Sequence, residues 1–251
     1  MKSKNAYLLY FLVYKNLQLK YKHSLLGFVW SFLHPLLYLL IFTFVFSKVF
    51  NSIPHYPLFV LSGLVFWIYF SASCNQLCQT FIRNAHMIKS LSVNKLYYAV
   101  SEQGAELINF MIGLIVFAVL MFFLGLQINW TLLYLIPIVI MFTFFTFSFG
   151  VILGSLNVFF RDIGILWGTL NPALFYLTPI AYSSATIPTK FLFIYKLNPL
   201  YHFYYIIRNV LYEGRSPEIK YVLYCLCICL ITFGMAVLVY RKTRNGFISN
   251  L

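Results

Sequence analysis

The sequence predicts an all-α integral membrane protein, and composition, segment length and charge placement all favour this fold class. Apolar residues make up 62% of the 251 residues and charged residues only 9%, whereas soluble domains carry ~25% charged residues. Several apolar segments are long enough to cross a hydrocarbon layer of ~30 Å as helices. The formal charge of +13 is dispersed over the chain, which favours anionic lipid over nucleic acid as the partner. We therefore expect one membrane domain over residues 1–251.

The first 22 residues predict a helix that lies in the membrane interface. A nine-residue apolar run follows Lys2 and Lys4, no small-residue cleavage site follows it, and Lys15, Lys20 and Lys22 come next. We expect this segment, 1–22, to be retained rather than removed as a signal peptide. A short apolar run bounded by lysines is typical of an interfacial helix.

Six spans are predicted, and their boundaries follow charges, prolines and short links. Pro35 falls inside the first span and is expected to kink it, and the seven-residue link at 51–57 is expected to be a turn. Glu102 and Glu106 precede the third span, where acidic groups complement the helix dipole. The predicted spans are 25–46, 58–78, 107–126, 132–149, 163–182 and 221–240.

Residues 81–98 interrupt the apolar pattern with a polar, basic stretch, which predicts a loop with helical character. Six spans place both ends of the chain on one side. That side, with the 81–98 loop and the junction at Arg161, holds twelve of the eighteen Lys and Arg residues. By the positive-inside rule, both termini and this loop are expected to face the cytoplasm.

The stretch 169–211 is too apolar for a surface loop and too broken for one span. Its apolar pieces at 189–197 and 200–212 are each shorter than the ~20 residues that a span needs. The stretch falls on the side opposite the termini, so we expect 186–212 to form a re-entrant helix pair at the outer face, between the fifth and sixth spans. Proline removes a backbone donor and clashes with the preceding turn. The prolines here are Pro172, Pro179, Pro188 and Pro199.

Sequence motifs give no sign of catalysis or of a bound cofactor in this chain. None of the twelve glycines begins the G-x-x-x-x-G-K-[ST] pattern that binds nucleotide phosphates. Every Asp and Glu lies at a span end or in a loop, which disfavours ion coupling. The five cysteines show no metal-ligand spacing with histidines and are interpreted as packing residues. His34 alone lies well inside a span, and we interpret it as a packing residue rather than a catalytic one.

Four ordered motifs resemble the membrane subunit of type-2 ABC exporters for bacterial surface polysaccharides. The first motif is a basic-aromatic pair followed by S-x-L-G-x-x-W, a proline and an apolar run that ends in Phe. The second motif resembles N-x-x-L-I-K. The third resembles F/Y-R-D. The fourth follows S/T-P-I-x-Y, I-P, N-P-L and R. The resemblance covers about residues 15–240, but the family's prolines after Lys95 are absent, which leaves the shape of that loop open. The matching residues are Lys20, Tyr21, Ser24, Leu26, Gly27, Trp30, Pro35 and Phe46; Asn84, Ile88 and Lys89; Phe160 to Asp162; and Thr178 to Tyr182, Ile187, Pro188, Asn198 to Leu200 and Arg208.

The resemblance implies an export channel in the bacterial inner membrane, built from a second copy of this chain and two copies of an ABC ATPase. ATP and Mg²⁺ would bind to that ATPase, and the substrate would be a lipid-linked polysaccharide such as O-antigen or capsule. Teichoic acid, drug or lipid export is the near alternative. A membrane-integral transferase is the alternative from another class of protein.

The same resemblance assigns roles to residues, each with a plainer alternative. The 81–98 loop corresponds to the helix that couples to the ATPase, rather than to a simple basic connector; its coupling residues are Arg83, Asn84, Ile88 and Lys89. The residues at the junction of the interfacial segment with the first span would contact an anionic lipid headgroup. The alternative is that they only anchor the chain at the membrane interface. These residues are Lys20, Tyr21, Lys22 and His23.

Aromatic rings suit a path along which a carbohydrate slides, because they offer a flat apolar face and a polar edge. The alternative is packing or an interfacial belt. As a group, the path residues are Trp30, Tyr38, Tyr69, Tyr176 and Tyr182. The outer re-entrant segment is expected to act as the exit gate, with Pro179, Pro188, Asn198, Pro199 and Arg208.

Overall fold

The computed structural model describes residues 2–22, 24–50, 53–90, 93–124 and 129–250, and over these residues it contains helices and no strand. Five helical stretches are long and apolar enough to cross a membrane. The predicted all-helical, multi-pass fold is therefore confirmed in outline. The stretches are Gly27–Phe46, Tyr56–Arg83, Leu96–Phe123, Trp130–Phe159 and Ile219–Asn250.

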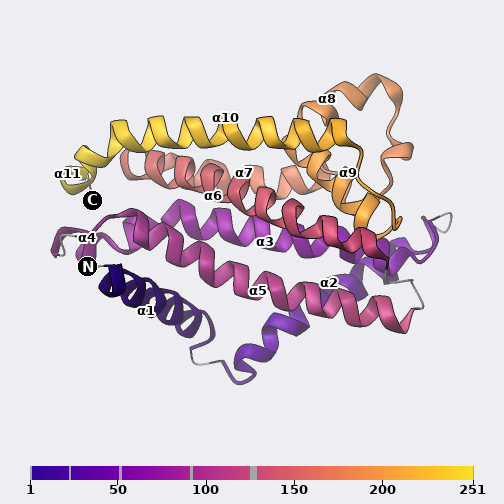
Figure 1. Ribbon diagram of the computed structural model, residues 1–251, viewed down its shortest axis with the longest axis horizontal. Coiled ribbons are helices and arrows are strands. Elements are labelled where there is room, and N and C mark those ends of the chain that lie inside the picture. Colours follow the sequence, from indigo (N-terminus) through magenta and orange to yellow (C-terminus); the bar gives the residue numbers. More distant parts are fainter. Residues whose placement is uncertain (1, 23, 51–52, 91–92, 125–128, 251) are drawn as a thin grey trace.

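The long helices lie lengthwise side by side, and α3 lies among them (Figure 1). Helix α3 packs against α2, α5, α6, α7 and α9. The bounds of the long helices are α2, Trp30–Phe46; α3, Tyr56–Arg83; α5, Leu96–Phe123; α6, Leu135–Phe159; and α10, Ile219–Thr243.

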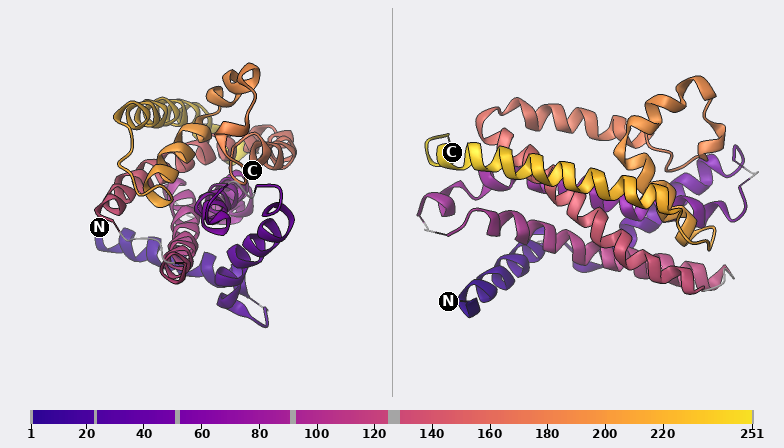
Figure 2. Two further views of the ribbon diagram at one scale, coloured as in Figure 1. Left: turned by 90° about the vertical axis from the view of Figure 1, so that its right-hand side faces the viewer. Right: turned by 45° about the horizontal axis from the view of Figure 1, so that its top comes forward.

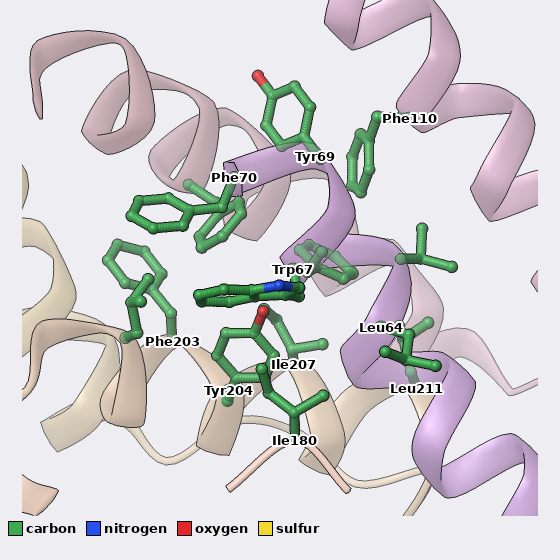
Figure 3. Packing of buried hydrophobic residues seen from close by; sticks show 14 of the residues in the cluster. Leu64, Trp67, Tyr69, Phe70, Phe110, Ile180, Phe203, Tyr204, Ile207 and Leu211 are labelled. Carbon is green, nitrogen blue, oxygen red and sulfur yellow. The ribbon is translucent and has the colours of Figure 1, made fainter. Parts of the chain in front are cut away.

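Helix α3 takes the central place because its sequence is apolar on every side over most of its length, which is typical of a fully buried helix. Aromatic side chains of α5 and α9, among them Phe110 and Phe203, lie beside it (Figure 3). The Tyr69 ring stacks on Phe110 of α5 with centroids 4.6 Å apart, and the Phe70 ring lies 6.1 Å from Phe145 of α6. On α6, a Cβ at Gly154 would lie 2.4 Å from the Leu77 carbonyl oxygen, so glycine permits the close approach of α6 to α3.

Both ends of the chain lie at the same end of the bundle, together with the short helix α4, Ala85–Ser90 (Figure 1). Helix α1, Lys2–Tyr21, packs along α5 outside the bundle (Figure 2). At the opposite end lie the end of α2, the start of α3 and a broken segment that contains α8, Leu192–Leu197, and α9, Pro199–Leu211. This arrangement separates three places of functional interest: the α4 end, the junction of α1 with α2, and the α8–α9 end.

Helix α7, Asp162–Tyr176, is shorter than the fifth predicted span, 163–182, and is not among the five stretches that qualify as spans by length and composition. It ends before Pro179 because the residue preceding a proline is driven out of helical geometry. The backbone turns tightly there, with the Ile180 amide donating to the Thr178 carbonyl at 2.7 Å. The count of six spans therefore stays a prediction.

Helix α5 begins at Leu96 rather than near the predicted start of the third span at residue 107. Glu102 and Glu106 therefore lie inside the helix instead of preceding it. Both are buried, at 8% and 4% exposure. Each has a basic partner on another element, so the helix accommodates two carboxylates that a sequence pattern places at its edge.

Candidate functional site

The connector between α3 and α5, residues 84–95, carries most of the residues that the sequence assigns to ATPase coupling; we call it the coupling segment. The Asn84 side chain donates to the Thr80 carbonyl at 2.8 Å and so closes the last turn of α3. On α4, Ile88 is 5% exposed, whereas Lys89 is exposed. Ile88 therefore anchors α4 to the bundle, and Lys89 is available to a partner.

Arg83, just before this segment, is engaged inside the molecule. Its guanidinium lies 2.9 Å from the Glu102 carboxylate on α5 and also donates to the Gln76 carbonyl at 3.4 Å. About half of the Arg83 side chain is exposed, but Glu102 is buried and depends on this cation. Arg83 thus has a structural role, and its assignment to ATPase docking stays a prediction.

A cavity of about 470 Å³ lies where the end of α1 meets α2, α3 and α5. Its wall is largely apolar but carries one cluster of polar side chains, for which we call it the polar chamber. The Lys20 ammonium donates to both carboxylate oxygens of Glu106, at 2.8 and 2.9 Å. The hydroxyl of Tyr21 donates to the Asn109 side-chain oxygen at 2.7 Å, and the hydroxyl of Ser31 donates to the same atom at 3.1 Å. Three helices therefore meet at one hydrogen-bonded cluster that faces a cavity.

The geometry of this cluster follows from the local sequence. On α5, Glu106 and Asn109 are three residues apart, so they lie on one face of the helix. Between α1 and α2, Gly27 has a φ of +47°, in the left-handed region that glycine adopts without a Cβ clash. This turn redirects the chain between α1 and α2 and places Ser31 beside Tyr21.

The chamber brings together only some of the residues assigned by sequence. Lys20, Tyr21, Trp30 and Tyr69 all line it. Tyr69 is 2% exposed and accepts a hydrogen bond from Gln103, so most of its ring belongs to the core. Of the predicted headgroup residues, Lys22 is exposed and absent from the chamber wall, and His23 lies outside the described residues.

The other predicted path aromatics lie elsewhere. Tyr38 is 43% exposed on α2 and packs edge-on against His34 at 4.9 Å. Tyr176 is the last residue of α7 and Tyr182 lies after it, and the Tyr182 hydroxyl donates to the Tyr176 carbonyl at 2.6 Å. Within one copy of the chain, the five aromatics do not form one continuous surface, so a shared path stays a prediction.

At the other end of the bundle, the broken segment consists of α8, Leu192–Leu197, and α9, Pro199–Leu211, separated by Asn198. The Asn198 side chain caps α9 by accepting from the Leu200 amide at 3.0 Å. Its amide group donates to the Leu177 carbonyl and to the Thr178 hydroxyl, at 3.2 and 2.9 Å. One residue therefore both starts α9 and fixes it to the turn after α7.

Arg208 of α9 binds the same turn through hydrogen bonds from its buried side chain. The residue is 8% exposed, its guanidinium donates to the backbone carbonyls of Ile180 and Tyr182, the latter at 3.5 Å, and it lies 3.8 Å from the centroid of the Phe59 ring. A nearby hydroxyl, from Tyr56 of α3, donates to the carbonyl of the intervening residue 181 at 2.9 Å. The turn is therefore bound to both α9 and α3.

The prolines predicted for this gate have different surroundings. Pro179 is buried in the turn, Pro188 is exposed, and Pro199 occupies the first turn of α9, where its missing amide proton costs nothing. Two short helices are present as predicted from the proline spacing. Their re-entry into a membrane is not tested by the structure and stays a prediction.

Sequence reasoning missed several residues that the structure places at these sites. Glu102 and Glu106 were assigned only a helix-dipole role, and Asn109 none. The sequence signal for these residues is their spacing on one helix: Glu106 follows Glu102 by four residues, and Asn109 follows Glu106 by three. Polar side chains on one face of an apolar helix need partners. Lys95 was counted only as a basic loop residue, yet burial and then the nearby Arg244 cation lower the pKa of its ammonium group.

A multi-pass helical chain with the short helix α4 at one end of the bundle, a polar chamber beside α1 and a broken segment at the far end fits a membrane transport subunit. Comparison with known families makes this specific. The chain belongs to the membrane family of ABC-2 type transporters, whose family model matches residues 7–212. The resemblance inferred from the sequence motifs is therefore confirmed.

Individual relatives extend the match over nearly the whole chain. Two proteins of Klebsiella pneumoniae, each described as O-antigen export system permease protein RfbA, are 33% identical to it over 236 residues, which cover 93% of this chain and 90% of theirs. A Myxococcus xanthus protein of the same description is 27% identical over 248 residues, covering 97% of this chain and 95% of its own. Family membership implies an ABC ATPase as partner.

Proposed function

We propose that this chain is the channel-forming membrane subunit of an ATP-driven ABC transporter that exports a lipid-linked, O-antigen-like polysaccharide across the bacterial inner membrane. The observation that carries the proposal is the 33% identity to O-antigen export permeases over 93% of the chain. The family match at residues 7–212 spans the polar chamber, the coupling segment and the broken outer segment. The likeness therefore extends to every candidate site rather than to one motif.

ATP and Mg²⁺ are assigned to a separate ATPase, of which two copies dock at the coupling segments of two copies of this chain. The exposure of Lys89 beside the buried Ile88 supports docking there. Pairing of two copies is supported by the small size of one bundle, because a two-fold pair can form a wide path at the shared interface. Closure of the ATPases would then displace the coupling segments and rearrange the spans.

The proposed topology has six spans and cytoplasmic termini. Both chain ends lie at one end of the bundle (Figure 1), which requires an even number of crossings. Five stretches qualify as spans, so α7 with the turn after it supplies the sixth. The excess of basic residues near the termini places them in the cytoplasm. The segment with α8 and α9 then lies at the outer face, where it acts as the exit gate.

In this topology, the polar chamber is where the substrate's anionic headgroup meets the protein. Lys20 and Tyr21 supply an ammonium group and a hydroxyl there. Because Lys20 already pairs with Glu106 at 2.8 Å, a phosphate group must compete with that carboxylate for the cation. The chamber would therefore hold a headgroup briefly rather than tightly, which suits a transport intermediate.

The test is a deletion of the gene, with complementation by the wild-type chain. The proposed function predicts that the mutant accumulates undecaprenyl-linked polymer inside the cell and loses surface glycan, and that complementation restores both. Normal surface glycan together with normal intracellular intermediates would rule the proposal out.

The same experiment separates the alternatives. Loss of a transferase would stop the polymer or change its chemical structure, so intracellular polymer of normal composition argues against that class. Teichoic acid export predicts accumulation of a phosphate-rich polymer, and drug or lipid export predicts that both polymers stay normal. An ATPase gene adjacent to glycosyltransferase genes would support glycan export before any deletion is made.

A further inference from the structure

A second buried cluster lies at the α4 end of the bundle, separate from the main core. Its members come from α1, α3, α4, α5, α6 and α10, and from the short helix α11, Phe247–Asn250. The Phe247 side chain is fully buried in it. The ring centroid of Phe247 lies 4.9 Å from that of Phe81 on α3, 6.1 Å from Tyr240 on α10 and 6.2 Å from Phe159 on α6.

Phe247 also reaches the far flank of the coupling segment. The Lys95 ammonium lies 5.0 Å from the centroid of the Phe247 ring, within the range of a cation–π contact. The same ammonium donates to the Arg244 carbonyl at 2.5 Å. Phe81 precedes the coupling segment and Lys95 ends it, so one aromatic side chain contacts both flanks.

A short 3-10 turn, a close backbone approach and a side-chain hydrogen bond shape the turn that returns Phe247 to the bundle. Residues Arg244–Gly246 form one turn of 3-10 helix after α10. A Cβ at Gly246 would lie 2.9 Å from the Phe159 ring, so glycine allows the backbone to pass close to α6. Asn250 donates to the Gly246 carbonyl at 2.8 Å and closes the turn.

We propose that residues 244–247 form a clasp in which Phe247 is a positioning residue: it fixes both flanks of the coupling segment and passes the segment's displacement to α6 and α10. This inference rests on the proposed function, because it requires that an ATPase moves the coupling segment.

The need for a clasp follows from chain connectivity. The coupling segment is covalently joined to α3 and α5, and α3 packs along α6, whereas α10 packs mainly against α6 and α9. A displacement of the segment therefore reaches α3, α5 and α6 through these connections, but it needs a further contact at this end of the bundle to reach α10. Phe247 supplies that contact, because its ring packs on Phe159 and Tyr240 as well as on Phe81. Packed elements of this kind transmit movement because a close-packed interface shifts as a unit.

The experiment uses the full transporter with its ATPase and compares Phe247→Ala with Ile248→Ala. Ile248 is the matched control, because it is the next residue on α11, is also apolar and is 58% exposed. Three quantities are measured: the melting temperature of the complex, the rate of ATP hydrolysis and the polymer exported per ATP hydrolysed. We expect Phe247→Ala to lower polymer exported per ATP by roughly threefold or more, and Ile248→Ala to leave all three unchanged. Phe247→Leu, which keeps apolar packing, should recover most of the ratio.

A second variant keeps the test decisive if Phe247→Ala fails to fold. Lys95→Met removes the hydrogen bond to the Arg244 carbonyl and the contact with the Phe247 ring without opening a cavity in the core, and it should also lower export per ATP. An unchanged ratio in the folded Lys95→Met complex, or losses of export and hydrolysis in equal proportion, would overturn the clasp. Failure of the wild-type complex to move polymer at all would instead contradict the proposed function.

Discussion

At the scale of single residues, buried charges determine how α1, α3 and α5 are held together. Glu102 and Glu106 lie four residues apart on α5, and both are buried. A buried carboxylate is unfavourable unless a cation compensates it. Arg83 and Lys20 provide that compensation from two different elements, at 2.9 and 2.8 Å. The acidic residues of α5 thereby bind α3 on one side and α1 on the other.

Replacement of Lys20 by Met should destabilise the protein by about 1–3 kcal/mol, because Glu106 would be left buried without its cation while Lys20 itself is one-third exposed and partly screened. Lys22→Met is the matched control, since Lys22 is exposed two residues away. The measurement is the melting temperature of both variants at one heating rate. Equal melting temperatures would show that the Lys20–Glu106 pair contributes little.

Arg83 and Lys89 should respond differently to charge reversal, although the sequence assigns both to coupling. Arg83→Glu places a second carboxylate beside buried Glu102, so we expect lower stability together with loss of export and hydrolysis. Lys89→Glu changes only an exposed charge on α4, so export should fall more than ATP hydrolysis at unchanged melting temperature. Parallel behaviour of the two variants would contradict this separation of roles.

At the scale of elements, the α8–α9 segment is held by a few side chains that bind backbone carbonyls. Asn198 starts α9 and fixes it to the end of α7, and Arg208 binds the turn at residues 180–182 while lying against Phe59. These contacts are concentrated at the two ends of α9, whereas α8, which precedes α9, has no buried residue. The geometry favours movement of α8 while α9 stays in place.

Arg208→Lys tests whether α9 is the fixed part of the gate. Lysine keeps the charge but lacks the planar fork that contacts two carbonyls and stacks on a ring, so we expect a loss of about 1–3 kcal/mol and greater labelling of single cysteines placed at 179–182. Arg215→Lys is the control, because Arg215 is 79% exposed with only a 3.9 Å ion pair to Glu213. Unchanged labelling in Arg208→Lys would show that other contacts hold the turn.

The sequence predicts the elements better than their contacts, and the reasons are physical. Apolar segments long enough to span a membrane identify the helices, and prolines mark the break at α8 and α9. The start of α5 was placed too late because a carboxylate in an apolar run signals a boundary unless its cation is known, and Arg83 and Lys20 lie far from Glu102 and Glu106 in sequence. Phe247 was overlooked for the same reason, because only the fold brings α11 back to α3 and α6.

At the scale of the whole molecule, the structure is one bundle with the coupling segment and the proposed clasp at one end, the α8–α9 segment at the other and the polar chamber beside α1. The helices that join the two ends are packed around α3 (Figure 1). Coupling by such a structure requires that the bundle moves in packed groups rather than bending locally. A second copy of the chain and two ATPases complete the proposed transporter.

Reconstitution tests the central claim most directly. The purified chain and its ATPase would be placed in vesicles with ATP outside, and undecaprenyl-linked polymer would be added to the outer leaflet. We predict that polymer accumulates in the lumen, protected from an added glycosidase, only when ATP is hydrolysed. Sustained ATP hydrolysis by a fully assembled complex without any protected polymer would contradict this prediction.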